Sequence, residues 1–205
     1  MLTKPGVKRI CGLMALLLAS VNIQAETSAE QQTMTFWMED PYARLYKEAT
    51  IPVPDKSLWN AKRINDYAES LMVNAAPPVG IMKIDDLNIQ IPIYNGTEEL
   101  NLNRGVGRIK GMARMNDESG NLGIAGHRDG IFRPLKDIQV GDDIIVETPL
   151  RTETYLVSSI TIVPKDDISV LEPTDERTMT LVTCYPFYHV GNAPKRYIVK
   201  ATAMQ

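Results

Sequence analysis

Three side chains in this 205-residue sequence could together perform nucleophilic chemistry: Cys184, His127 and Arg196. Cys184 and His127 each end a short apolar run, and Arg196 follows Cys184 by twelve residues. A thiol of ordinary acidity is mostly protonated at neutral pH, and a nearby imidazole can accept its proton and later return one. An arginine is always charged and can stabilise the negative charge that develops on an attacked carbonyl oxygen. The three residue types therefore indicate acyl transfer through a thioester.

Each of these residues also has an ordinary structural interpretation. Cys184 could be a buried apolar residue, His127 a hydrogen-bonded histidine at a strand end, and Arg196 a surface arginine. Their joint appearance at strand ends favours a functional site, but the residues alone leave both interpretations open. His189, the other histidine of the sequence, lies in a polar stretch and is predicted to be exposed and not catalytic.

The sequence predicts no metal or cofactor. One cysteine outside the N-terminal segment, with one or two histidines and no Cys-x-x-Cys or His-x-x-x-His pair, does not form a zinc-ligand set. Neither a phosphate-binding glycine-rich loop nor a Gly-x-Ser-x-Gly motif is present. The formal net charge of -3 and the scattered lysines and arginines also predict no nucleic-acid partner.

Short strands must position the three reactive residues. Segments rich in β-favouring residues alternate with turn residues such as Asn95-Gly96 and Asp129-Gly130, and no long helix separates them. This pattern predicts an all-β barrel or sandwich of about 130 residues. The predicted strands span residues 80–84, 89–94, 122–125, 143–148, 154–163, 178–183 and 197–203, and a helical turn is predicted near residues 100–105.

The N-terminal segment has the layout of a secretory signal. Lys4, Lys8 and Arg9 precede an apolar run over residues 10–21, and Ala25 supplies a small residue at which cleavage could occur. We therefore predict that residues 1–25 are a signal peptide, with an uncleaved membrane anchor as the alternative. Removal of this segment leaves Cys184 as the only cysteine, so the exported chain could form no internal disulfide.

A spacer and a helix are predicted to precede the strands. Residues 26–76 are expected to form a polar spacer, with one helical turn near 42–48, followed by an amphipathic helix over 58–74. Ser57 is the predicted N-cap of this helix, and the pair Pro77-Pro78 is expected to end it. The catalytic β-domain is then predicted to span residues 77–205.

The residues around Cys184 resemble the signature of the sortase family. Residues 180–184 read Thr-Leu-Val-Thr-Cys and match Thr-Leu-x-Thr-Cys, and His127 and Arg196 stand in the family's order. Gly-His-Arg-Asp over 126–129 and Gly-Asn-Ala-Pro-Lys-Arg over 191–196 look most like class D sortases. The resemblance covers about residues 77–205 and implies a closed eight-stranded sortase-type β-barrel with short helices and an N-terminal helical extension.

The same resemblance implies a role for each site residue. Cys184 corresponds to the nucleophile, His127 to the general acid and base, and Arg196 to the group that orients the substrate and stabilises the oxyanion. Substrate-binding residues are expected at Ala125, Thr183 and Tyr185. No cofactor is implied.

The implied function is a cysteine transpeptidase that works in the cell envelope. Its substrate would be a protein with a C-terminal Leu-Pro-x-Thr-Gly-like sorting signal, and its acceptor an amine from a peptidoglycan precursor or a pilin lysine. We expect an exported protein, either periplasmic or anchored to the membrane through its N-terminus and facing outward. The alternatives are an envelope cysteine peptidase that mainly hydrolyses its substrate and a β-barrel binding module with a relict site.

Overall fold

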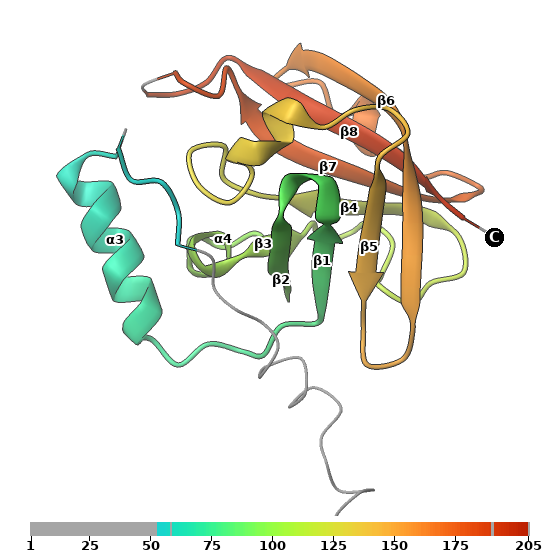
Figure 1. The fold of residues 1–205 in the computed structure, drawn as a ribbon, viewed down its shortest axis with the longest axis horizontal. Coiled ribbons are helices and arrows are strands. Elements are labelled where there is room, and N and C mark those ends of the chain that lie inside the picture. Colours follow the sequence, from blue (N-terminus) through green and yellow to red (C-terminus); the bar gives the residue numbers. More distant parts are fainter. Residues whose placement is uncertain (1–52, 58, 190, 205) are drawn as a thin grey trace, which may run out of the picture. The chain divides into compact units, whose positions relative to one another are not determined.

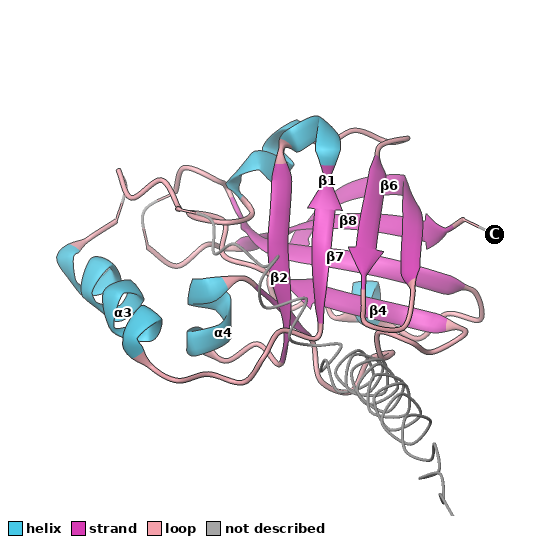
Figure 2. Ribbon diagram, turned by 60° about the horizontal axis from the view of Figure 1, so that its bottom comes forward, coloured by secondary structure: helices cyan, strands magenta, loops and turns pink. Residues whose placement is uncertain are grey.

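A computed structural model describes residues 53–57, 59–189 and 191–204 of the chain. The predicted signal peptide over 1–25 and the predicted helical turn over 42–48 lie outside the described residues. Within the described residues, eight strands close into a barrel in the order β1-β2-β3-β4-β7-β8-β6-β5 (Figures 1 and 2). The predicted closed eight-stranded barrel is therefore confirmed.

Most barrel strands are those that the sequence predicts, often extended by one or two residues at an end, and β5 is one residue shorter than predicted. The exception is β3, which the sequence analysis did not predict. The strands are β1 (Gly80–Ile84), β2 (Ile89–Asn95), β3 (Val106–Arg108), β4 (Gly120–Ala125), β5 (Asp143–Glu147), β6 (Thr152–Pro164), β7 (Arg177–Tyr185) and β8 (Lys195–Ala203).

Short helices connect several of these strands. They are α4 (Glu99–Arg104), where a helical turn is predicted, and three 3-10 helices, η1 (Asp85–Leu87), η2 (Arg133–Asp137) and η3 (Ser169–Leu171). None of the helices that the structure describes is long and apolar enough to cross a membrane.

Apolar side chains from the inner face of the strands fill the barrel. Alternate residues of a strand point to opposite faces, so each strand contributes every second side chain to the interior. On β7 and β8 the inward residues include Met179, Leu181 and Val199, all of which are fully buried. The side chains between them point to the outer face of the barrel, which is covered at Thr180 and Ile198 but leaves Val182 and Cys184 half-buried.

Before the barrel, the chain forms α3 (Ala61–Met72), which contacts α4 (Figure 1). The predicted N-cap Ser57 is wrong, because Asn60 accepts a hydrogen bond from the Arg63 amide at 2.8 Å and begins the helix. Trp59 precedes the N-cap, and its indole N–H donates to the Asp129 carbonyl at 2.9 Å, which holds the ring against the loop after β4. The helix also ends at Met72, before the proline pair.

Strand β7 lies between β4 and β8, and this arrangement determines where the site forms. β4 pairs with β7 in parallel, with Ala125 opposite Val182, and the Gly126 amide continues the pairing by donating to the Val182 carbonyl at 3.2 Å. β7 pairs with β8 antiparallel, with Cys184 opposite Arg196. The next residue after Gly126 therefore lies level with Cys184.

Gly126 is expected to be required for this end of β4. A Cβ built on Gly126 would lie 2.6 Å from the ring of Phe132, which is fully buried, whereas a Cβ on Gly130 in the same loop would lie 3.5 Å from its nearest neighbour. Gly126→Ala should therefore lower the free energy of unfolding by about 1–3 kcal/mol through overpacking. Gly130→Ala should change it much less. Urea unfolding of both variants tests this, and equal losses would contradict it.

Candidate active site

Cys184 and Arg196 lie side by side on the outer face of the barrel. They are direct partners across β7 and β8, and directly opposite residues of an antiparallel pair extend to the same face. Both side chains are half-buried. The Arg196 guanidinium donates through Nη1 to the carbonyls of Lys195 at 3.0 Å and Ala193 at 3.3 Å, which holds it at the base of the loop that joins the two strands.

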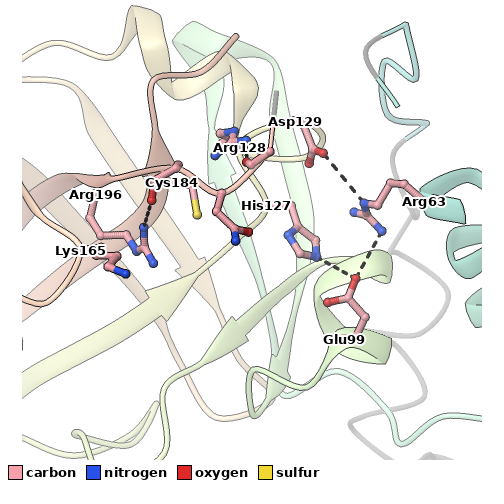
Figure 3. A pocket seen from close by; sticks show the side chains of 11 residues that line it. Arg63, Glu99, His127, Arg128, Asp129, Lys165, Cys184 and Arg196 are labelled. Carbon is pink, nitrogen blue, oxygen red and sulfur yellow. Dashed lines mark hydrogen bonds and ion pairs between the residues drawn. The ribbon is translucent and has the colours of Figure 1, made fainter. Parts of the chain in front are cut away.

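His127 completes the group from the other side of β7. It is the second residue after β4, and its backbone carbonyl accepts from the Phe132 amide at 3.0 Å, so the loop that carries it folds back on itself. Its side chain lies on the same side of the barrel as Cys184 (Figure 3). The structure therefore brings together Cys184, His127 and Arg196, which come from three neighbouring strand ends.

All three residues line one cavity of about 410 Å³. Its lining contains more cations than carboxylates, although the whole chain has a net charge of -3. Such a lining favours negative charge that develops on a bound carbonyl oxygen. The other charged residues of the lining are Arg63, Glu99, Arg128, Asp129 and Lys165.

Glu99 on α4 contacts the histidine. Its Oε1 lies 3.4 Å from His127 Nε2, in an ion-pair contact that does not have the geometry of a hydrogen bond. The contact with His127 lowers the pKa of Glu99, with further lowering by the charges of Arg63 and Lys62, while partial burial opposes the shift. Glu99 therefore carries a negative charge at neutral pH beside the imidazole.

Arg63 on α3 connects this carboxylate to the rest of the cavity wall. Its Nη1 lies 3.5 Å from Glu99 Oε1, and its Nε lies 3.9 Å from Asp129 Oδ2 (Figure 3). Arg63 also donates to Asn103, and its guanidinium lies 4.4 Å from the centre of the Trp59 ring. These contacts attach the helix before the barrel to the wall beside His127.

The loop between β7 and β8 forms the opposite wall. The Arg128 guanidinium donates to the carbonyls of His189 and Gly191, each at 2.8 Å, and so ties this loop to the loop that carries His127. Phe187 is buried and packs edge to face against Tyr197, with ring centres 5.1 Å apart. His189 is exposed, as predicted, and is not part of the cavity lining.

The three predicted substrate-binding residues do not line this cavity. Thr183 is 2% exposed and points into the barrel, because it precedes the outward-facing Cys184. Its hydroxyl donates to the Gly126 carbonyl at 2.8 Å, which supports a structural role in place of contact with substrate. Tyr185 stacks on Tyr197 with ring centres 6.2 Å apart, and Ala125 is half-buried at the end of β4.

Sequence reasoning did not single out Arg63, Glu99 or Lys165 as site residues. Arg63 lies in a segment predicted to be helical, and Glu99 directly precedes the predicted helical turn over 100–105. Charged residues in and beside such helices usually face solvent. Their meeting depends on how α3 packs on α4, which no local spacing encodes. Arg128 and Asp129 directly follow His127 in the sequence. Their position beside a predicted site residue already indicated that they would line the cavity. No group of three or more metal-ligating side chains occurs in the described part of the chain.

The chain forms a closed β-barrel, and the cavity on its outer face is lined by the Cys184 thiol. The structure thus defines the class of protein as a β-barrel with a thiol in a surface cavity. A family model described as the Sortase domain matches residues 82–204. The chain therefore belongs to the sortase family.

Relatives and solved structures agree with this family. Sortase D of Bacillus subtilis is 40% identical over 121 residues, which are 58% of this chain and 61% of that relative. A Clostridium perfringens sortase D5 transpeptidase structure has a TM-score of 0.57 at 26% identity, with 73% of this chain and 92% of that chain covered. The catalytic domain of B. anthracis SrtD has a TM-score of 0.54 at 32% identity, with 64% and 90% covered.

Replacing Thr183 with valine should affect stability more than substrate binding. Thr183→Val keeps the shape of the buried side chain but removes its hydrogen bond to the Gly126 carbonyl. We therefore expect the free energy of unfolding to fall by about 1–2 kcal/mol. Thr178→Val changes a half-exposed residue of the same strand and should lower the free energy of unfolding by less. Urea unfolding measures both losses. A Thr183→Val variant with unchanged stability and a raised KM for peptide substrate would support direct substrate contact instead.

Proposed function

We propose that this chain is a cysteine transpeptidase that cuts a C-terminal sorting signal on another protein and joins the new end to an amine. The observation that carries this proposal is the placement of Cys184, His127 and Arg196 on one outer edge of the barrel, around one cavity. Membership of the sortase family supports it. The matched region covers 61% of the length of the B. subtilis sortase D, which is less than two thirds of that relative.

In the proposed first step, the Cys184 thiolate attacks the carbonyl carbon of the scissile peptide bond. A carbon–sulfur bond forms and the carbonyl oxygen becomes an oxyanion, which lies near the Arg196 guanidinium. The oxyanion then collapses and the carbon–nitrogen bond breaks. The leaving amine takes a proton from the His127 imidazolium, and a thioester remains on Cys184.

In the second step, the acceptor amine attacks the thioester carbonyl. His127 takes a proton from the incoming nitrogen, the carbon–sulfur bond breaks, and Cys184 leaves as the thiolate. Water can replace the amine, and the product is then a free carboxylate. The two outcomes share every protein group, so the choice between transfer and hydrolysis depends on which nucleophile reaches the thioester.

The proposed substrate carries a Leu-Pro-x-Thr-Gly-like signal, cut after the threonine. A peptidoglycan precursor or a pilin lysine is the proposed acceptor. We place the enzyme in the cell envelope after export, with an N-terminal segment that is either removed or retained as an anchor. These assignments rest on the family resemblance and on the basic and apolar composition of residues 1–25.

A ligation assay tests the proposed function. The full chain with Cys11→Ser, in detergent, is mixed with a labelled Leu-Pro-x-Thr-Gly peptide series and a glycine or diaminopimelate amine, and the products are identified by mass spectrometry. We expect an amine-ligated product and a thioester intermediate on Cys184, and neither product nor intermediate with Cys184→Ala. Hydrolysis without ligation at every amine concentration would favour the peptidase alternative. Ligation by Cys184→Ala would contradict the assigned nucleophile.

The guanidinium of Arg196 should not be replaceable by an amine. Arg196→Lys keeps the positive charge but loses the planar set of donors, so we expect kcat/KM for the ligated peptide to fall by about 100-fold or more. Lys195→Ala, at the exposed neighbouring position, serves as the matched control and should stay within about twofold of the unmodified chain. Near-normal turnover by Arg196→Lys would contradict the assigned role.

A further inference from the structure

The two ring nitrogens of His127 have different surroundings. Nε2 is buried and, among the described residues, has no hydrogen-bond partner. The Glu99 carboxylate lies 3.4 Å from it. The other nitrogen, Nδ1, lies on the edge of the ring that faces Cys184 (Figure 3). The ring is thus placed between a carboxylate and a thiol.

This difference matters because a neutral imidazole carries its single proton on one nitrogen or the other. Only the nitrogen without a proton can accept one from a thiol. A carboxylate beside Nε2 stabilises the form with the proton on Nε2, which leaves the lone pair of Nδ1 free. It also stabilises the doubly protonated ring that forms after proton transfer.

We propose that Glu99 is a positioning residue that keeps the His127 proton on Nε2 and turns Nδ1 toward the Cys184 thiol, and that Arg63 holds Glu99 in place for this task. The role in catalysis rests on the proposed function, whereas the orientation of the ring does not. Glu99 acts through His127 and needs no contact with substrate.

The surroundings of Glu99 suit this role. Contact with His127 and the charges of Arg63 and Lys62 lower its pKa, so it remains a carboxylate across the neutral range. Its side chain is 60% exposed and would sample many rotamers without the cation at 3.5 Å. Arg63 itself is fixed by Asn103, by Asp129 and by stacking on Trp59. The other charged or titratable groups around the ring are Arg128, Lys165, Cys184 and Arg196.

The neighbouring Glu98 provides a matched control. It is exposed, pairs with Lys110 and is not part of the cavity lining. Glu98 and Glu99 are adjacent in sequence and both have the same side chain, so Glu98→Ala and Glu99→Ala make the same chemical change at the start of α4. A change in the His127 signals that Glu99→Ala causes and Glu98→Ala does not therefore reports the contact between Glu99 and His127.

The first test reads the position of the proton by nitrogen-15 NMR of the full chain labelled at histidine. The sequence contains two histidines, so exposed His189 is an internal reference. Above the pH at which the rings titrate, we expect His127 to be the Nε2–H form in the unmodified chain and in Glu98→Ala. In Glu99→Ala we expect the signals to move toward a mixture of the two forms. An unchanged His127 spectrum in folded Glu99→Ala would overturn the proposal.

The second test measures peptide ligation. We expect Glu99→Ala to lower kcat by about tenfold or more with KM within about twofold, because the ring is misplaced while the substrate still binds. Glu99→Gln keeps an oxygen that can accept from Nε2–H, so it should recover part of the loss. Equal kcat for Glu99→Ala and Glu98→Ala would overturn the proposal that Glu99 positions His127 for catalysis. If the unmodified chain ligates no peptide, the proposed function fails, and the NMR result still decides the orientation of His127.

Discussion

The register of β7 between β4 and β8 is the constraint on which the site depends. Cys184 faces outward because Leu181 and the other core residues of its strand face inward. A shift of one residue in this pairing would place the thiol in the core and expose apolar side chains, which is costly. The packing that stabilises the barrel therefore also fixes the direction of the Cys184 thiol and of Arg196, its partner across the strands.

The histidine depends on a different kind of contact. No strand pairing reaches His127 itself. Glu99 on α4 contacts its ring, and Arg63 on α3 contacts Glu99. Glu99 and Arg63 belong to helices outside the β-sheet. The barrel therefore positions the cysteine, and the helices complete the environment of the histidine. The site thus combines a rigid hydrogen-bonded part with a part held by ion pairs, and ion pairs at a half-exposed surface weaken as salt increases.

Much of this could be predicted from the sequence, and the failures have physical causes. The strand over 80–84 was predicted at its observed bounds because a mainly apolar run lies there between Pro77-Pro78 and Asp85-Asp86. β3 has three residues, Val106–Arg108, which is too short for a period to appear. Ser57 and Asn60 are both residue types that favour N-caps, so the sequence does not distinguish them, and in the structure Asn60 caps the helix. The inward direction of Thr183 follows from the two-residue repeat once Cys184 is assigned to the surface.

The hydrogen bond between Thr183 and Gly126 joins residues that are 57 positions apart, whereas Cys184 and Arg196 belong to one local hairpin. Contacts that are close in sequence form more readily than distant ones, which must first close a long loop. A chain that has formed this hairpin but not the pairing of β4 with β7 holds its cysteine without the imidazole. Until β4 pairs with β7, such a chain has no imidazole beside its thiol, so the three side chains of the site come together only when the barrel closes.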